Sequence, residues 1–199
     1  MNKLRNFALA ALCGAILATS ASAGTLAMDF TAPTTNFTNG QWSLGWEFNL
    51  TQAVTVTQLG FYDSNQDDLT ERHEVGIYDS AGTLLVSGIV APGDMLVSWF
   101  RMTNVAPTVL AAGNGYRIAA TTGSEDYTWD PIGFVTDSRV QFVADSFTFS
   151  SSLVFPVNSV GLTGWFGPNF AIGAAVPEPS TYAMLGSAIA ALAMLRRRK

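Results

Sequence analysis

Hydrophobic and polar residues alternate along the middle of this chain with a period of two. Trp42, Leu44, Trp46, Phe48 and Leu50 share one parity, and small or polar residues occupy the other. This pattern is typical of a β-strand with one buried face. Six further segments have strand character: 54–61, 74–78, 83–90, 97–102, 116–121 and 140–149. In segments 54–61 and 140–149 the hydrophobic parity changes partway, which predicts a β-bulge or a bend at a sheet corner.

The body of the chain contains no sustained 3.6-residue period with helix caps, so the sequence predicts an all-β domain. Asp79–Gly82 indicates a hairpin turn between two predicted strands, and Gly113–Gly115 indicates a second turn. Short strands spaced by about 8–12 residues favour a sandwich over an open sheet. We expect a jelly-roll-like β-sandwich, with an immunoglobulin-like sandwich as the alternative.

The first residues have the three parts of a secretory signal peptide. Lys3 and Arg5 are positive, the segment 7–18 is apolar, and small residues at 21–23 form a cleavage site. We therefore expect an exported protein whose mature chain begins at Gly24. The alternative, an uncleaved anchor helix, is disfavoured because the apolar run is short.

The last residues combine a rigid tripeptide, an apolar run and a block of cations. Pro177, Glu178 and Pro179 form an extended segment, because two prolines fix φ and remove two donors. Residues 182–195 carry no charge and favour a helix, although roughly 21 Å is short for a bilayer. A buried core helix is the alternative. Four terminal cations favour a membrane span, because they stop translocation: Arg196, Arg197, Arg198 and Lys199.

This tail closely resembles the Pro-Glu-Pro (PEP-CTERM) C-terminal sorting signal of Gram-negative surface proteins. The resemblance implies recognition by exosortase, a membrane-embedded processing enzyme, after signal peptidase has acted. It also implies an intermediate anchored in the inner membrane, followed by a place at the cell surface or in the extracellular matrix. The expected organisation is a signal peptide (1–23), a sandwich (24–170), a linker with the motif (171–180), a transmembrane helix (181–195) and a basic cytoplasmic tail (196–199).

The body between the two ends is strongly acidic. Residues 24–176 contain four arginines, no lysine, ten aspartates and four glutamates, so their net charge is 4 − 14 = −10. Such a surface repels polyanions, and we expect no binding to nucleic acid. The single cysteine, Cys13, lies in the predicted signal peptide, which predicts a mature protein without disulfides.

One acidic segment has the spacing of a calcium-binding loop. Oxygen-bearing side chains recur at alternating positions, and a carboxylate lies twelve positions from the first: Asp63, Asn65, Asp67, Glu71 and Glu74. The sixth position is Asp68, where a sharp turn normally requires glycine. The alternative is a solvated acidic loop, since aspartate and asparagine are ordinary turn residues. Calcium is the one cofactor that the sequence suggests.

The sequence gives no sign of an active site. His73 is the single histidine, and a lone histidine near a strand start is more often a packing residue. A serine-hydrolase G-x-S-x-G motif, a phosphate-binding glycine loop and zinc-ligand spacing are all absent from the sequence. We predict that the protein is not an enzyme and has no catalytic residues.

Five tryptophans are candidates for either the core or a binding surface. Trp42 and Trp46 share the apolar face of one predicted strand, which favours the core. Trp99, Trp129 and Trp165 are better placed for exposure, and Trp129 lies in an acidic, loop-like segment where its ring could stack on a sugar.

The body also resembles a domain common in proteins that carry this sorting tail. The matching segments lie between Trp42 and Phe170, at 59–63, 67–69, 73–79, 82–85 and 164–170, although the related domains usually have glycine at the position of Asp68. The resemblance implies fold and location without an activity. We expect a structural or adhesive protein of the cell surface or matrix. The alternative is a module that binds carbohydrate such as exopolysaccharide, with or without calcium.

Overall fold

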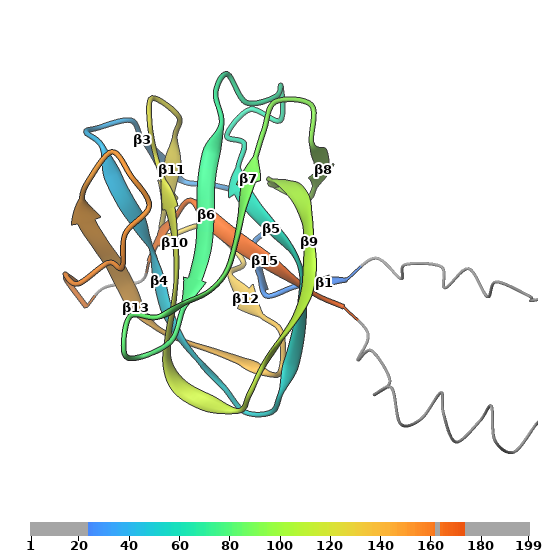
Figure 1. Ribbon diagram of the computed structural model, residues 1–199. Helices are drawn as coiled ribbons and strands as arrows, with labels where there is room; N and C mark the ends of the chain where they lie inside the picture. Colours follow the sequence, from blue (N-terminus) through green and yellow to red (C-terminus); the bar gives the residue numbers. More distant parts are fainter. Residues whose placement is uncertain (1–23, 162–163, 174–199) are drawn as a thin grey trace, which may run out of the picture.

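The computed structural model describes residues 24–161 and 164–173, and these residues form a sandwich of antiparallel sheets (Figure 1). The first main sheet has the order β1 (Thr25–Leu26), β15 (Pro168–Gly173), β5 (Val54–Tyr62), β9 (Phe100–Leu110) and β8 (Met95–Val97). The second has the order β13 (Val140–Phe149), β4 (Trp42–Leu50), β10 (Gly113–Thr121), β6 (His73–Tyr78) and β7 (Leu84–Val90). The predictions of an all-β fold and of a sandwich are confirmed.

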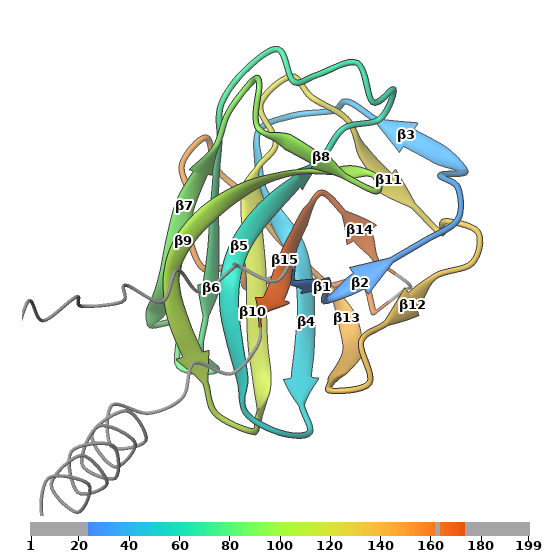
Figure 2. The same cartoon turned by 90° about the vertical axis from the view of Figure 1, so that its right-hand side faces the viewer.

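Two smaller sheets close one side of the sandwich. One contains β14 (Trp165–Phe166), β11 (Tyr127–Trp129) and β3 (Thr35–Phe37), and the other pairs β12 (Val135–Thr136) with β2 (Met28–Asp29). Figure 2 shows β14, β11 and β3 together beyond the start of β15. The connections from β4 to β5, from β5 to β6 and from β9 to β10 each cross from one main sheet to the other.

Aromatic side chains fill the space between the main sheets. Trp46 and Phe48 of β4 are fully buried, and their ring centroids lie 6.0 and 5.1 Å from that of Phe170 on β15. The indole Nε1 of Trp46 donates to the carbonyl of Pro168 (2.9 Å), so one hydrogen bond joins the two sheets. Burying each such ring contributes about 1.5–3 kcal/mol, which explains the strict alternation of β4.

Both predicted changes of parity are β-bulges. In the pairing with β15, β5 has one extra residue between Val56 and Gln58, and in the pairing with β4, β13 has one extra residue between Phe142 and Ala144. An extra residue on one strand turns later side chains to the other face. After the bulge in β5, Leu59 and Phe61 are buried in the core, whereas after the bulge in β13, Phe147 is partly buried and Phe149 is 70% exposed.

Three local predictions are corrected. Residues 97–102 are two strands instead of one, because Ser98 adopts a φ of 54° and reverses the chain between β8 and β9. Gly113–Gly115 lies within β10 and produces a register shift there, so it is a bulge and not a turn. The sandwich extends to Gly173, because β15 pairs along its whole length; the linker predicted for 171–180 therefore begins too early.

The first and last described strands are neighbours. Thr25 of β1 pairs with Ile172 of β15, next to the last described residue, Gly173. Gly173 in turn pairs with Thr55, close to the connection between β4 and β5. The start of β4 at Trp42 and the segment leading into β15 lie at the other end of these strands.

Candidate functional site

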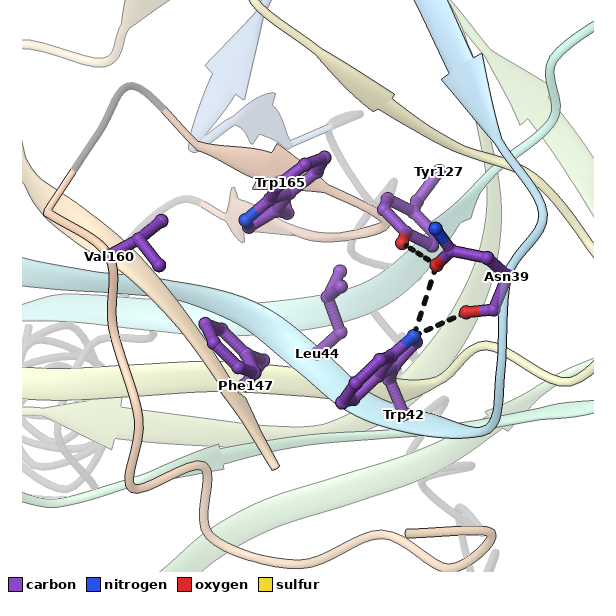
Figure 3. Close-up of a pocket in the computed structure, with 7 residues that line it drawn as sticks. All are labelled: Asn39, Trp42, Leu44, Tyr127, Phe147, Val160 and Trp165. Atoms are coloured by element: carbon purple, nitrogen blue, oxygen red, sulfur yellow. Dashed lines mark hydrogen bonds between the residues drawn. The ribbon is translucent and has the colours of Figure 1, made fainter. Parts of the chain in front are cut away.

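A pocket lies at the end of the sandwich where β4 begins, and aromatic side chains form most of its wall (Figure 3). Its volume is about 230 Å³. Seven residues from five separate segments line it: Asn39, Trp42, Leu44, Tyr127, Phe147, Val160 and Trp165. The pocket depends on the fold, because residues that follow one another along its lining can be far apart in the chain: Leu44 and Tyr127, for example, are 83 positions apart.

Trp165 is packed by other rings on one side of the pocket. Its ring centroid lies 5.6 Å from that of Tyr127 and 5.1 Å from that of Phe37, both at 80°, and 4.4 Å from that of Trp129. Edge-to-face contacts of this kind are worth about 0.5–1.5 kcal/mol each beyond the buried area. They fix the orientation of the Trp165 indole, which remains partly exposed.

Trp42 holds a similar position on the other side. Its ring meets Phe147 (5.7 Å, 86°) and Phe149 (5.4 Å, 85°) from β13, and Phe149 is 70% exposed. The pocket therefore continues into an open aromatic surface along the edge strand β13.

Asn39 is the polar residue that orders the rings between these two sides. Its Oδ1 accepts hydrogen bonds from the hydroxyl of Tyr127 (2.5 Å) and from Nε1 of Trp42 (3.3 Å). The same indole also donates to the backbone carbonyl of Asn39. Burial raises the pKa of Tyr127, so its hydroxyl stays protonated and continues to donate at neutral pH.

The wall at Val160 belongs to a strap, residues 150–161, that leaves β13 and crosses the outer face of the second sheet. The buried carboxylate of Asp145 accepts hydrogen bonds from the backbone N–H of Val160 (3.1 Å) and of Gly161 (2.9 Å). Ser43 fixes the middle of the strap, because its hydroxyl donates to the carbonyl of Val154 (2.6 Å). These bonds position a loop wall that has no regular secondary structure of its own.

The sequence predicted part of this site. Trp129 and Trp165 are both partly exposed, as expected; Trp165 lines the pocket, and Trp129 packs against Trp165. Trp46 is in the core, but Trp42, assigned to the core by its parity, lines the pocket because β4 begins there beyond the facing sheet. Trp99 stacks on Phe30 elsewhere. Asn39, Phe147 and Val160 had no distinguishing sequence pattern.

The proposed calcium ligands are held apart by protein contacts. Asp63 is 2% exposed and binds Nε of Arg101 (2.7 Å), Glu71 accepts from the hydroxyl of Ser124 (2.8 Å), and Glu74 accepts from a strap N–H (3.3 Å). Asn65 and Asp67 are exposed. Within 24–161 and 164–173, no three histidine, cysteine or acidic side chains come together as a metal site.

Asp68 takes the position where the calcium pattern has glycine, and its φ of 91° is one that glycine adopts most readily. Its carboxylate accepts from the N–H groups of Leu69 (2.9 Å) and Gly93 (2.9 Å). These bonds lower the pKa of Asp68, so it remains ionised. The acidic loop is thus ordered by its own backbone and by the neighbouring turn.

His73 is a core residue. It is fully buried, its ring lies parallel to that of Phe61 with centroids 3.8 Å apart, and its Nδ1 lies 2.8 Å from the carbonyl oxygen of Thr121. Burial lowers its pKa, and Nε2 has no hydrogen-bond partner among the described residues. This environment matches the packing role that was expected.

The predicted signal peptide, the predicted transmembrane helix and the sorting residues Pro177, Glu178, Pro179 and Arg196–Arg198 lie outside the described residues. Among the residues that are described, no helix is long and apolar enough to cross a membrane.

Comparison with known families places both parts of the chain. Residues 30–166 match the family model described as a domain of unknown function (DUF4082), and residues 175–199 match the PEP-CTERM protein-sorting motif. No curated protein and no solved structure matches the chain significantly. The chain therefore belongs to the DUF4082 family, and its PEP-CTERM motif assigns it to the exported proteins that an exosortase system sorts.

Proposed function

We propose that this protein is a non-catalytic surface adhesin whose sandwich binds a glycan of the cell surface or extracellular matrix. The aromatic pocket between Trp42 and Trp165 is the observation that carries this proposal. The sorting motif supports the location, since an exosortase system handles exported proteins.

The chemistry of the pocket suits a sugar ring. One face of a pyranose presents C–H groups, which pack against aromatic rings, while its hydroxyls need a few hydrogen-bonding groups at the edge. The pocket offers indole and phenol rings of Trp42, Trp165 and Tyr127 with one amide, Asn39. Ligand sites for drug-sized molecules usually have about 300–1,000 Å³, so 230 Å³ suits one ring of a longer chain.

The position of the pocket also suits an adhesin. Gly173, which leads toward the sorting motif, pairs with Thr55 at the end of β5 that is remote from the pocket. A tether at Gly173 would therefore leave the pocket facing away from the attachment point. The arrangement of Asp63, Glu71 and Glu74 supports binding without calcium, because each carboxylate already has a protein partner.

The test is a binding measurement with immobilised exopolysaccharide of the producing cell and a glycan array. Trp165→Ala should weaken binding at least about tenfold, because the ring is part of the contact surface. Trp99→Ala is the matched control, since this indole stacks on Phe30 outside the pocket and should leave affinity unchanged. Circular dichroism verifies that both variants fold. No binding to any glycan, or equal losses in both variants, would refute the proposal and favour a purely structural role.

A further inference from the structure

We propose that the pocket selects an uncharged sugar residue and rejects uronic acids and sulfated sugars. This inference rests on the proposed function and names the ligand class of the same site. Three features of the described residues support it: the chemistry of the lining, the placement of the arginines and the acidic groups behind the walls.

None of the described residues that line the pocket has a charged side chain. Its polar groups are the amide of Asn39, the hydroxyl of Tyr127 and two indole N–H groups, and the remaining surface is apolar. Asn39 Oδ1 already accepts from Tyr127 and Trp42. A neutral sugar needs only such weak, uncharged contacts beside its stacked face. A carboxylate placed there would lose water without gaining a cation, which is strongly unfavourable.

No arginine is among the described residues that line the pocket. Three of the four are in ion pairs at 2.7–2.8 Å: Arg101 with Asp63, Arg117 with Glu47, and Arg139 with Asp137. The fourth, Arg72, precedes β6, and the second sheet places β10 between β6 and the pocket strand β4. No lysine occurs between residues 24 and 176. A uronate in the pocket therefore has no arginine or lysine to pair with among the described lining residues.

Acidic side chains instead hold the walls of the pocket. Asp145 binds the strap at Val160, and Asp126 accepts a hydrogen bond from Thr38, next to Asn39. Asp130 follows Trp129 at the end of β11. These carboxylates, within a body of net charge −10, make the local potential negative and repel an anionic ligand.

The test compares matched oligosaccharides that differ only at C6, which is a hydroxymethyl group in one and a carboxylate in the other. Gluco-, manno- and galacto-oligomers are each paired with the C6-oxidised uronate oligomer of the same linkage and length. The full chain in a detergent without a sugar headgroup is titrated with each, and tryptophan fluorescence reports binding. We expect at least one neutral oligomer to bind about tenfold or more tightly than its uronate, a difference of about 1.4 kcal/mol. Salt should reduce this difference and leave neutral binding unchanged.

Charge-neutralising variants test whether the nearby carboxylates, and not only the shape of the pocket, cause the preference for a neutral sugar. Asp126→Asn with Asp130→Asn keeps an oxygen acceptor for Thr38 and should narrow the preference for the neutral oligomer at least about threefold. Asp79→Asn, in the turn between β6 and β7, is the matched control and should not change it. Equal affinity for a neutral oligomer and its uronate would overturn this inference while leaving glycan binding intact. Failure of every oligomer and of the native exopolysaccharide would overturn the proposed function itself.

Discussion

Asp137 provides the most quantitative prediction about stability. Its carboxylate accepts from Nε of Arg139 (2.7 Å) and from the hydroxyl of Thr25 (3.0 Å), so it attaches β1 to the segment before β13. Hydrogen bonds from Arg139, the largest cause, lower the pKa of Asp137 from 3.8 to about 2. The side chain of Asp137 is 11% exposed and that of Arg139 is 25% exposed, so solvent only partly screens the pair.

The expected energy follows from that pKa. The interval between 3.8 and about 2, at 1.36 kcal/mol per pH unit, gives an upper limit of about 2.4 kcal/mol. Solvent reaches the partly exposed side chain of Arg139 and screens the ion pair, so the true contribution lies below this upper limit. We expect Asp137→Asn to lower the free energy of unfolding by about 1–2 kcal/mol at pH 7. Because the pKa of Asp137 is lower in the folded than in the unfolded protein, the ionised carboxylate stabilises the folded state fully above pH 3.8. This stabilisation is lost as the pH falls toward 2.

Urea unfolding of residues 24–173, followed by tryptophan fluorescence, measures the difference between wild type and Asp137→Asn. At pH 3 roughly half of the pH 7 difference should remain. Comparing the two proteins at each pH cancels the titration of the other carboxylates. A difference below about 0.5 kcal/mol at pH 7, or one that stays constant down to pH 3, would contradict the assigned role of the ion pair.

Three further predictions concern the core and the acidic loop. Gly45→Ala would place Cβ 2.0 Å from a backbone carbonyl oxygen of β10, so the free energy of unfolding should fall by about 3 kcal/mol or more. Gly113→Ala is the control: its Cβ would lie 3.6 Å from a tyrosine ring, and it should change the free energy of unfolding by less than about 1 kcal/mol. Equal effects of the two variants in thermal denaturation would be inconsistent with the close approach at Gly45. Burial lowers the pKa of His73, so the free energy of unfolding should fall as the pH drops below 6.5, by at most about 1.4 kcal/mol per pH unit. His73→Gln should remove this pH dependence between pH 7 and 5. If the variant keeps the same pH dependence, other titrating groups must cause it. Asp63→Asn should cost about 2–3 kcal/mol, because it removes the buried carboxylate 2.7 Å from Arg101 and leaves only the longer ion pair of Arg101 with Asp68 at 3.6 Å. Calcium titrated into wild type should produce no binding heat, and a saturable calcium isotherm would show that the loop can rearrange around the ion.

The alternation of side chains predicted much of the fold because it reports directly on burial. The period of two in β4 located a core strand, and the changes of parity in β5 and β13 located two bulges. The same rule failed at Trp42, since parity identifies a face of a strand but not where the opposing sheet ends. The glycines at 113–115 were ambiguous because positive φ serves both turns and bulges, and Gly115 has a φ of 78°.

The site was less predictable because its parts meet only through long-range pairing. The segments that carry Asn39, Tyr127 and Val160 are brought together by sheet order, which local patterns do not contain. The spacing from Asp63 to Glu74 indicated calcium, yet Arg101, 38 positions after Asp63, provides the positive charge instead. Spacing of oxygen atoms alone could not reveal a competing cation from another strand.

The short path from Trp165 through β14 and β15 to Gly173 has a mechanical consequence. Tension between a ligand held at Trp165 and an attachment beyond Gly173 would run along β15, whose hydrogen bonds to β5 and β1 lie across the direction of pull. Such bonds are loaded together in shear instead of being unzipped one at a time. If the proposed glycan contact holds a cell in flowing liquid, we expect that contact to break before β15 is pulled out of its sheet.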